Sequence, residues 1–304
     1  MKEIFIHIGH SKTGTTTLQD HLFSKHDQIA YLGRPYKNNL FEKEVRRLAL
    51  QDSTQYNYKG LRCIIDTYKN SIKDKPIVIS EETFSTVRCT DRGLMANRIK
   101  NIFYPCKIII TIRNQLDIIQ SYYLNFDCII EKLNKPTGHI VNFKEWIQYM
   151  LKNKESSYLS EIEYYDLIKY YSDLFGYDNV IVLLFEEFVH HKELFIEKLS
   201  SFIGVDKKQS FNLINQKHER KGPSQREFLY MKILSKYFLG LPINNYLSLG
   251  KTANNLIINF FKKGGKPVIQ MDEWVKPLEE LFRKGNKKIS KEYSLPLAKY
   301  NYPL

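Results

Sequence analysis

The feature that most constrains the fold is a short apolar run followed by a turn rich in glycine and threonine. Residues 4–8 are apolar apart from one histidine, and Leu18 and Leu22 after the turn share one face of a predicted helix. A turn between a strand and a helix gathers backbone N–H groups around one point, where they can bind an anion. We therefore predict a phosphate-binding loop. Its residues would be Ser11, Lys12, Thr13, Gly14, Thr15, Thr16 and Thr17.

The residue order in this loop differs from that of ATP-binding loops. Those loops read G-x-x-x-x-G-K-[ST]. Here Thr15 follows the second glycine, and the lysine, Lys12, lies two residues before that glycine. The apolar run at 107–112 also ends in Arg113 rather than in an acidic magnesium ligand. We therefore expect the loop to bind phosphate without a metal ion.

Four short runs rich in Ile and Val predict a central sheet. They span residues 4–8, 76–80, 107–112 and 179–185, and helical periodicity separates them. Buried strands joined by crossover helices are typical of parallel sheets. The sequence therefore predicts an α/β fold with a P-loop-type central parallel sheet flanked by helices.

Longer amphipathic segments predict helices at 158–175, 191–203, 223–238 and 273–293. Gly176 and Gly204 are placed to end the first two. No linker divides the chain, so we expect a single domain over residues 1–304. Within it, residues 205–272 would form either a cap over the binding site or a surface elaboration.

A second motif follows the run at 107–112. Arg113 ends that run, and Ser121 lies eight residues further on, two turns along a predicted helix. A guanidinium at a strand end and a hydroxyl on a helix can bind one phosphate together, with the arginine in a bidentate fork.

Together the two motifs resemble those of the PAPS-dependent sulfotransferase superfamily, in particular its bacterial, carbohydrate-sulfotransferase-like members. The resemblance implies that Lys12, Gly14, Thr15 and Thr16 bind the 5′-phosphosulfate of PAPS (3′-phosphoadenosine 5′-phosphosulfate). It implies that Arg113 and Ser121 bind the 3′-phosphate. Residues Arg220, Lys221 and Gly222 are similar to a triplet that some eukaryotic members place on the same phosphate, or they form a solvated charged run.

Sulfuryl transfer needs a base to accept the proton of the attacking group. The run at 76–80 delivers Glu81 and Glu82 to the carboxyl edge of the sheet, where open α/β proteins bind ligands. In similar glycan sulfotransferases a Glu-Lys-Thr or Glu-Lys-Ser at this point supplies the base, which identifies Glu81, while Glu82 replaces the lysine. An adjacent carboxylate would raise the pKa of such a base. Glu82, His10 and His139 are the alternative bases.

The net charge of +13 favours an anionic partner. PAPS and a carbohydrate or other hydroxyl-bearing acceptor fit it, and a basic surface would also suit peripheral contact with an anionic membrane. We find no nucleic-acid-binding motif. Four scattered cysteines give no metal-binding spacing, and the polar N-terminus predicts a cytoplasmic protein.

The sequence thus predicts a sulfotransferase in which Lys12 stabilises the departing oxygen and Glu81 takes the proton of the acceptor. Two alternatives share the loop. A P-loop kinase would need the lysine after the second glycine and an acidic magnesium ligand. A nucleotide-binding module without catalytic activity would need only the loop.

Overall fold

The computed structural model describes residues 3–36, 39–72, 74–86, 91–124, 141–215, 222–237 and 265–304. They fall into two compact units. The first comprises Met1–Asn114, Ser160–Glu219 and Phe282–Leu304, and the second comprises Gln115–Leu159 and Arg220–Leu281.

The first unit is built on a five-stranded sheet in the order β2-β3-β1-β4-β5, and every neighbouring pair is parallel. The strands are β1 Ile4–His7, β2 Ala30–Gly33, β3 Ile77–Ser80, β4 Lys107–Ile112 and β5 Val180–Leu184. The predicted fold class and four of these strands are confirmed, with ends that agree within one residue. The edge strand β2 was not predicted, because its four residues end in glycine and carry little strand signal.

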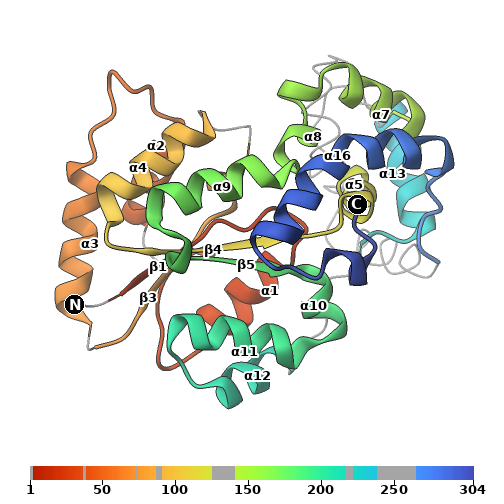
Figure 1. The fold of residues 1–304 in the computed structure, drawn as a ribbon. Coiled ribbons are helices and arrows are strands. Elements are labelled where there is room, and N and C mark those ends of the chain that lie inside the picture. The colour runs from red at the N-terminus through yellow and green to blue at the C-terminus, as the bar shows by residue number, and fades with distance from the viewer. Residues whose placement is uncertain are drawn as a thin grey trace, which may run out of the picture. The chain divides into compact units, whose positions relative to one another are not determined.

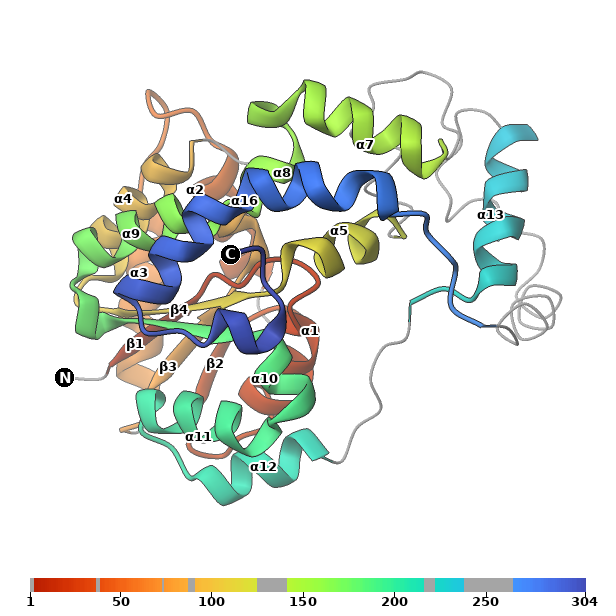
Figure 2. The ribbon, with the colours of Figure 1, turned by 45° about the vertical axis from the view of Figure 1, so that its right-hand side comes forward.

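Helices cover both faces of this sheet (Figures 1 and 2). On one face the buried side chains of Phe5, Val78, Ile109 and Leu183 form a core with residues of the helical segments η1, α10, α11 and α12. On the opposite face α9 contacts β4 and β5, and α4 packs against α9.

The helical segments of the first unit lie between the strands and after the last strand along the chain. They are α1 Thr15–Thr17, η1 Leu18–Phe23, α2 Asn39–Leu50, α3 Lys59–Ser71, η2 Glu82–Ser85, α4 Arg92–Phe103, α9 Tyr164–Phe175, η4 Tyr177–Asn179, α10 Phe185–His190, α11 Lys192–Ile203, α12 Lys207–Asn215 and η5 Leu297–Tyr300. Gly176 and Gly204 end α9 and α11 with φ of 93° and 80°, as predicted.

The second unit contains α5 Gln115–Tyr123, α7 Phe143–Lys152, η3 Lys154–Ser156 and α13 Gln225–Tyr237, and the division between the units falls within α8 Tyr158–Glu161. Its core is aromatic, with the rings of Tyr122 and Tyr158 stacked at 3.5 Å and Trp146 fully buried beside Tyr122. Helix α16, Asp272–Glu292, runs from this unit into the first.

Two helix predictions need correction. The single helix predicted at 158–175 is wrong, because Glu163 adopts a non-helical ψ of 77° and separates α8 from α9. The helix predicted from Pro223 begins later, because Ser224 caps it. The amide of Glu227 donates to Ser224 Oγ at 3.1 Å, and the amide of Ser224 donates to Glu227 Oε2 at 3.4 Å. Helices α11 and α16 agree with the prediction within one residue.

The predicted cap or elaboration at 205–272 contains α12 and α13, while residues 216–221 and 238–264 lie outside the described part. Its role stays a prediction. Among the helices that are described, none combines the length and the apolarity needed to cross a membrane.

Candidate active site

The loop between β1 and α1 is held against β4 and turns through two left-handed residues. The amides of Ile8 and His10 donate to the carbonyls of Ile109 and Thr111 at 3.0 and 3.4 Å. Lys12 and Gly14 then have φ of 69° and 83°. Helix α1 continues into η1, so a helical segment from Thr15 to Phe23 follows the turn. The amide of Thr17 donates to the carbonyl of Gly14 at 3.0 Å, and the amides before it lie in the first turn, where intrahelical acceptors are lacking. The binding of an anion by this loop stays a prediction.

Thr13 fixes the loop from inside. Its side chain is buried, and its Oγ1 lies 2.5 Å from the carbonyl oxygen of His10 and 2.7 Å from Thr111 Oγ1. The Thr13 hydroxyl therefore points into the core. Ser11, Thr16 and Thr17 are half-buried in the same loop and helix.

A buried polar network supports the loop and was not predicted. Residues His7 and Ser80 are paired in the register of β1 and β3, and His7 Nδ1 lies 2.7 Å from Ser80 Oγ. Gln19 Nε2 donates to the same hydroxyl at 3.0 Å. Burial lowers the pKa of His7 to about 3, so its ring is neutral at pH 7. The signal in the sequence was the polar residue that ends each of two neighbouring apolar strands.

Arg113 connects the end of β4 to the loop. Its Nη1 donates to the carbonyl of Lys12 at 3.2 Å, and its guanidinium lies 4.7 Å from the centroid of the Phe185 ring. Its Nε is buried and has no hydrogen-bond partner in the part of the chain that is described. An arginine at the loop with an unfilled donor fits the predicted role in anion binding.

The backbone after Arg113 is also fixed. The amide of Asn114 donates to Glu186 Oε1 at 2.8 Å, and Tyr302 donates to Glu186 Oε2 at 2.9 Å. Burial raises the pKa of Glu186. The side chain of Asn114 donates to the carbonyls of Tyr300 and Asn301 at 3.0 and 2.7 Å, which fastens the C-terminal segment to the end of β4.

The other predicted phosphate ligands lie elsewhere in the chain. Ser121 is half-buried on α5 in the second unit. Gly222 is exposed just before α13, and Arg220 and Lys221 lie outside the described residues. The predicted assignment of these four residues to the 3′-phosphate stays a prediction.

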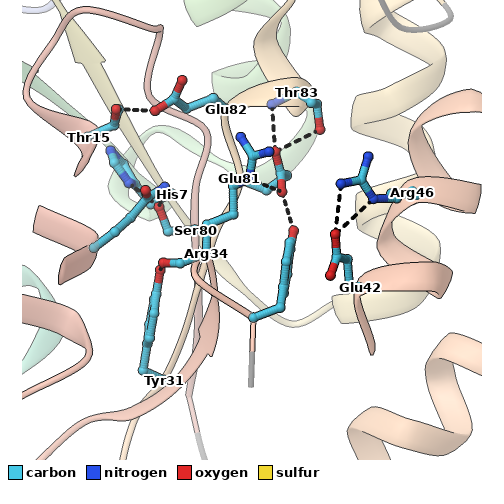
Figure 3. Close-up of polar contacts among 12 residues, drawn as sticks. His7, Thr15, Tyr31, Arg34, Glu42, Arg46, Ser80, Glu81, Glu82 and Thr83 are labelled. Carbon is cyan, nitrogen blue, oxygen red and sulfur yellow. Dashed lines mark hydrogen bonds and ion pairs between the residues drawn. The ribbon is translucent and has the colours of Figure 1, made fainter. Parts of the chain in front are cut away.

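Glu81 is buried at the end of β3 and held by three side chains (Figure 3). Its Oε1 accepts from the amide and the hydroxyl of Thr83 at 3.1 and 3.0 Å. Its Oε2 accepts from the hydroxyl of Tyr36, and the Nε of Arg34 lies 3.9 Å from the same oxygen. Arg34 and Tyr36, which follow β2, were missed because β2 was missed.

Glu82 begins η2 and turns to a different partner. Its Oε1 accepts a hydrogen bond from the hydroxyl of Thr15, in the phosphate loop (Figure 3). Burial raises the pKa of Glu82, Glu81 adds to the increase, and Thr15, Arg34 and Lys12 oppose it. The two adjacent carboxylates therefore have different partners. Glu82 is hydrogen-bonded to Thr15 in the loop, and Glu81 contacts Arg34 and Tyr36 after β2.

Of the two histidines predicted as alternative bases, only His10 lies among the described residues. His10 is buried, its ring lies 5.0 Å from that of Tyr164, and neither ring nitrogen has a partner among the described residues. Burial, with a smaller effect of Arg92, lowers the pKa of His10 to about 3. His139 lies outside the described residues.

The geometry thus combines the predicted anion-binding loop after β1 with two carboxylates after its neighbour β3. A family model described as "Sulfotransferase domain" matches residues 2–236 of the chain. The chain belongs to the sulfotransferase family. This confirms the predicted membership of the PAPS-dependent sulfotransferase superfamily, so the protein is a transferase enzyme.

Solved sulfotransferases show a distant likeness to this one. A sulfotransferase from Alicyclobacillus acidocaldarius is 18% identical, with a TM-score of 0.49 over 68% of this chain and 83% of its own. Mouse SULT7A1, complexed with PAP, is 14% identical, with a TM-score of 0.44 over 92% and 88%. The sulfotransferase domain of the curacin biosynthetic pathway is 11% identical, with a TM-score of 0.46 over 96% and 97%. A search of curated proteins finds no match.

Metal ligands do not gather in the described part of this sulfotransferase. Its described residues contain no group of three or more His, Cys, Asp or Glu side chains that could hold a metal ion. The two carboxylates beside the loop, Glu81 and Glu82, each take hydrogen bonds from hydroxyl groups instead.

Proposed function

We propose that this sulfotransferase moves a sulfuryl group from PAPS to a hydroxyl or amine of its acceptor, and that the acceptor is a carbohydrate or glycoconjugate. The observation that carries the proposal is the contact between Thr15 in the loop after β1 and Glu82 after β3, with Glu81 next to it. This contact brings anion-binding groups and carboxylates to one edge of the sheet. A glutamate as base favours a carbohydrate, because similar glycan sulfotransferases use one.

The donor would lie along the loop. Backbone amides of residues 11–17 and the side chain of Lys12 would bind the 5′-phosphosulfate, and Arg113 would bind the 3′-phosphate together with Ser121. The unfilled, buried Nε of Arg113 supports this assignment, since a buried donor without an acceptor is costly. Arg220, Lys221 and Gly222 would add to the same phosphate. Because Lys12 and Arg113 neutralise the donor, the proposal includes no metal ion.

The chemical step breaks one bond and forms one. The acceptor oxygen attacks the sulfur, the bond from sulfur to the bridging oxygen of the 5′-phosphate breaks, and the acceptor proton passes to Glu81. Three hydrogen bonds already reach the carboxylate of Glu81 from Tyr36 and Thr83. An ionised carboxylate has about four acceptor sites, so one remains for the acceptor hydroxyl. Lys12 would stabilise charge on the departing oxygen.

The test is transfer of labelled sulfate from PAPS to a panel of sugars and lipid-linked glycans, in the presence of EDTA. Glu81→Gln keeps size but removes the base, so its turnover should fall by about 10²–10⁴ while PAP affinity stays near that of the wild type. Glu42→Gln, which changes a carboxylate paired with Arg46 on α2, is the matched control and should transfer normally. Normal turnover in Glu81→Gln would move the base to Glu82, His10 or His139. A strict need for Mg²⁺ would contradict the proposed neutralisation by Lys12 and Arg113.

A further inference from the structure

The contact between Glu82 and Thr15 places a carboxylate where the proposed donor must bind. Thr15 is the first residue of α1, and its hydroxyl donates to Glu82 Oε1. The methyl group of Thr15 faces Gly9, because a Cβ added at Gly9 would lie 2.8 Å from Thr15 Cγ2. The Thr15 hydroxyl is therefore directed to Glu82 by packing on its other side.

The charges around Glu82 come from three segments. Lys12 in the loop and Arg34 after β2 favour its ionised form, while Glu81 and burial oppose it, and burial is the largest effect. The hydrogen bond from Thr15 therefore holds a carboxylate, rather than a cation, against the loop. An ionised Glu82 would repel an anionic donor across a distance of a hydrogen bond or two.

We propose that Glu82 is a donor-site residue that occupies the phosphate loop in the free protein and takes up a proton when PAPS or PAP binds. A protonated Glu82 is neutral and can donate a hydrogen bond to a phosphate oxygen. The inference rests on the proposed function, because it assumes that the 5′-phosphate lies in this loop.

The sign of the pH dependence follows from charge. A bound anion favours the protonated form of Glu82, so the bound state holds more protons than the free state, and PAP affinity falls as pH rises. Above the range in which free Glu82 titrates, each pH unit would cost up to tenfold in affinity, until the bound group also loses its proton. Glu82→Gln stays neutral, so it should lose this part of the pH dependence.

The test is isothermal titration of PAP into wild type and variants from pH 5 to pH 8, in buffers of different ionisation enthalpy. The phosphates of PAP themselves titrate near pH 6, so the quantity compared is the difference between wild type and variant. At pH 8, Glu82→Gln should bind PAP about tenfold more tightly than the wild type, and its proton uptake should be lower by up to one proton. Glu82→Lys should bind more tightly still, and Glu42→Gln should match the wild type.

The possible results separate this inference from the proposed function. If Glu82→Gln and Glu82→Lys bind PAP with wild-type affinity and proton uptake at every pH, the inference is wrong and the proposed function stands. If no form of the protein binds PAP, both are wrong. Thermal melting of each variant checks that it is folded. If Glu82→Lys does not fold, the inference is still supported when the wild type takes up more protons on binding PAP than Glu82→Gln does.

Discussion

Gly9 should tolerate no side chain, because the loop packs against the sheet at this residue. A Cβ at Gly9 would lie 2.2 Å from Thr111 Oγ1 and 2.5 Å from His7 Nε2, and both of these side chains are fully buried. Gly9→Ala must therefore displace Thr111 and break its hydrogen bond to Thr13. Overpacking costs about 1–3 kcal/mol, and the lost hydrogen bond adds about 0.5–1.5 kcal/mol. We expect the free energy of unfolding to fall by about 1.5–4.5 kcal/mol.

Guanidinium unfolding followed by circular dichroism measures this loss. Both tryptophans, Trp146 and Trp274, lie in the second unit, so their fluorescence reports that unit while circular dichroism reports the whole chain. Gly285→Ala is the control, because its Cβ would meet Tyr165 Cβ at an ordinary 3.5 Å inside α16. The free energy of unfolding of Gly285→Ala should rise by about 0.5–1 kcal/mol. A Gly9→Ala protein within about 0.5 kcal/mol of the wild type would refute the packing described for the loop.

Two further predictions concern stability. Lys198→Met leaves the buried Glu187 without the ammonium that lies 2.7 Å from its carboxylate, and should cost about 2–4 kcal/mol of unfolding free energy by denaturant titration. Lys207→Met, which breaks an exposed pair, should cost less than about 1 kcal/mol, and equal costs would contradict the argument. The depressed pKa values of His7 and His10, each about 3, should make stability fall as pH drops from about 6.5 toward 3. Denaturant melts across this range that show no loss would refute their burial as neutral rings.

The sequence predicted the elements whose signal is local. Strands β1, β3, β4 and β5 were found because each is a run of branched apolar residues that is buried on both faces. The turn between β1 and α1 was predicted because left-handed backbone favours glycine at fixed positions, as at Gly14. These properties depend on residues that are neighbours in the chain, so they can be predicted from a single sequence.

The features that were missed depend on contacts between distant segments. Glu81 and Glu82 are neighbours in the chain, yet their partners, Tyr36 and Thr15, come from different strand ends. The inward turn of the Thr13 hydroxyl depends on Thr111 in the same way, with the two oxygens 2.7 Å apart. No periodicity or spacing encodes such pairs, because they arise only when strands β1, β2, β3 and β4 are placed side by side.

The measurement that tests the central claim most directly is the affinity of the wild-type protein for PAP compared with AMP, by isothermal titration at one pH. The two nucleotides differ only in the 3′-phosphate, which distinguishes PAPS from ordinary adenine nucleotides. A charge-assisted contact to Arg113 contributes about 1.5–3 kcal/mol, so PAP should bind roughly ten- to a hundredfold more tightly than AMP. Equal affinities would contradict the assignment of PAPS as the donor.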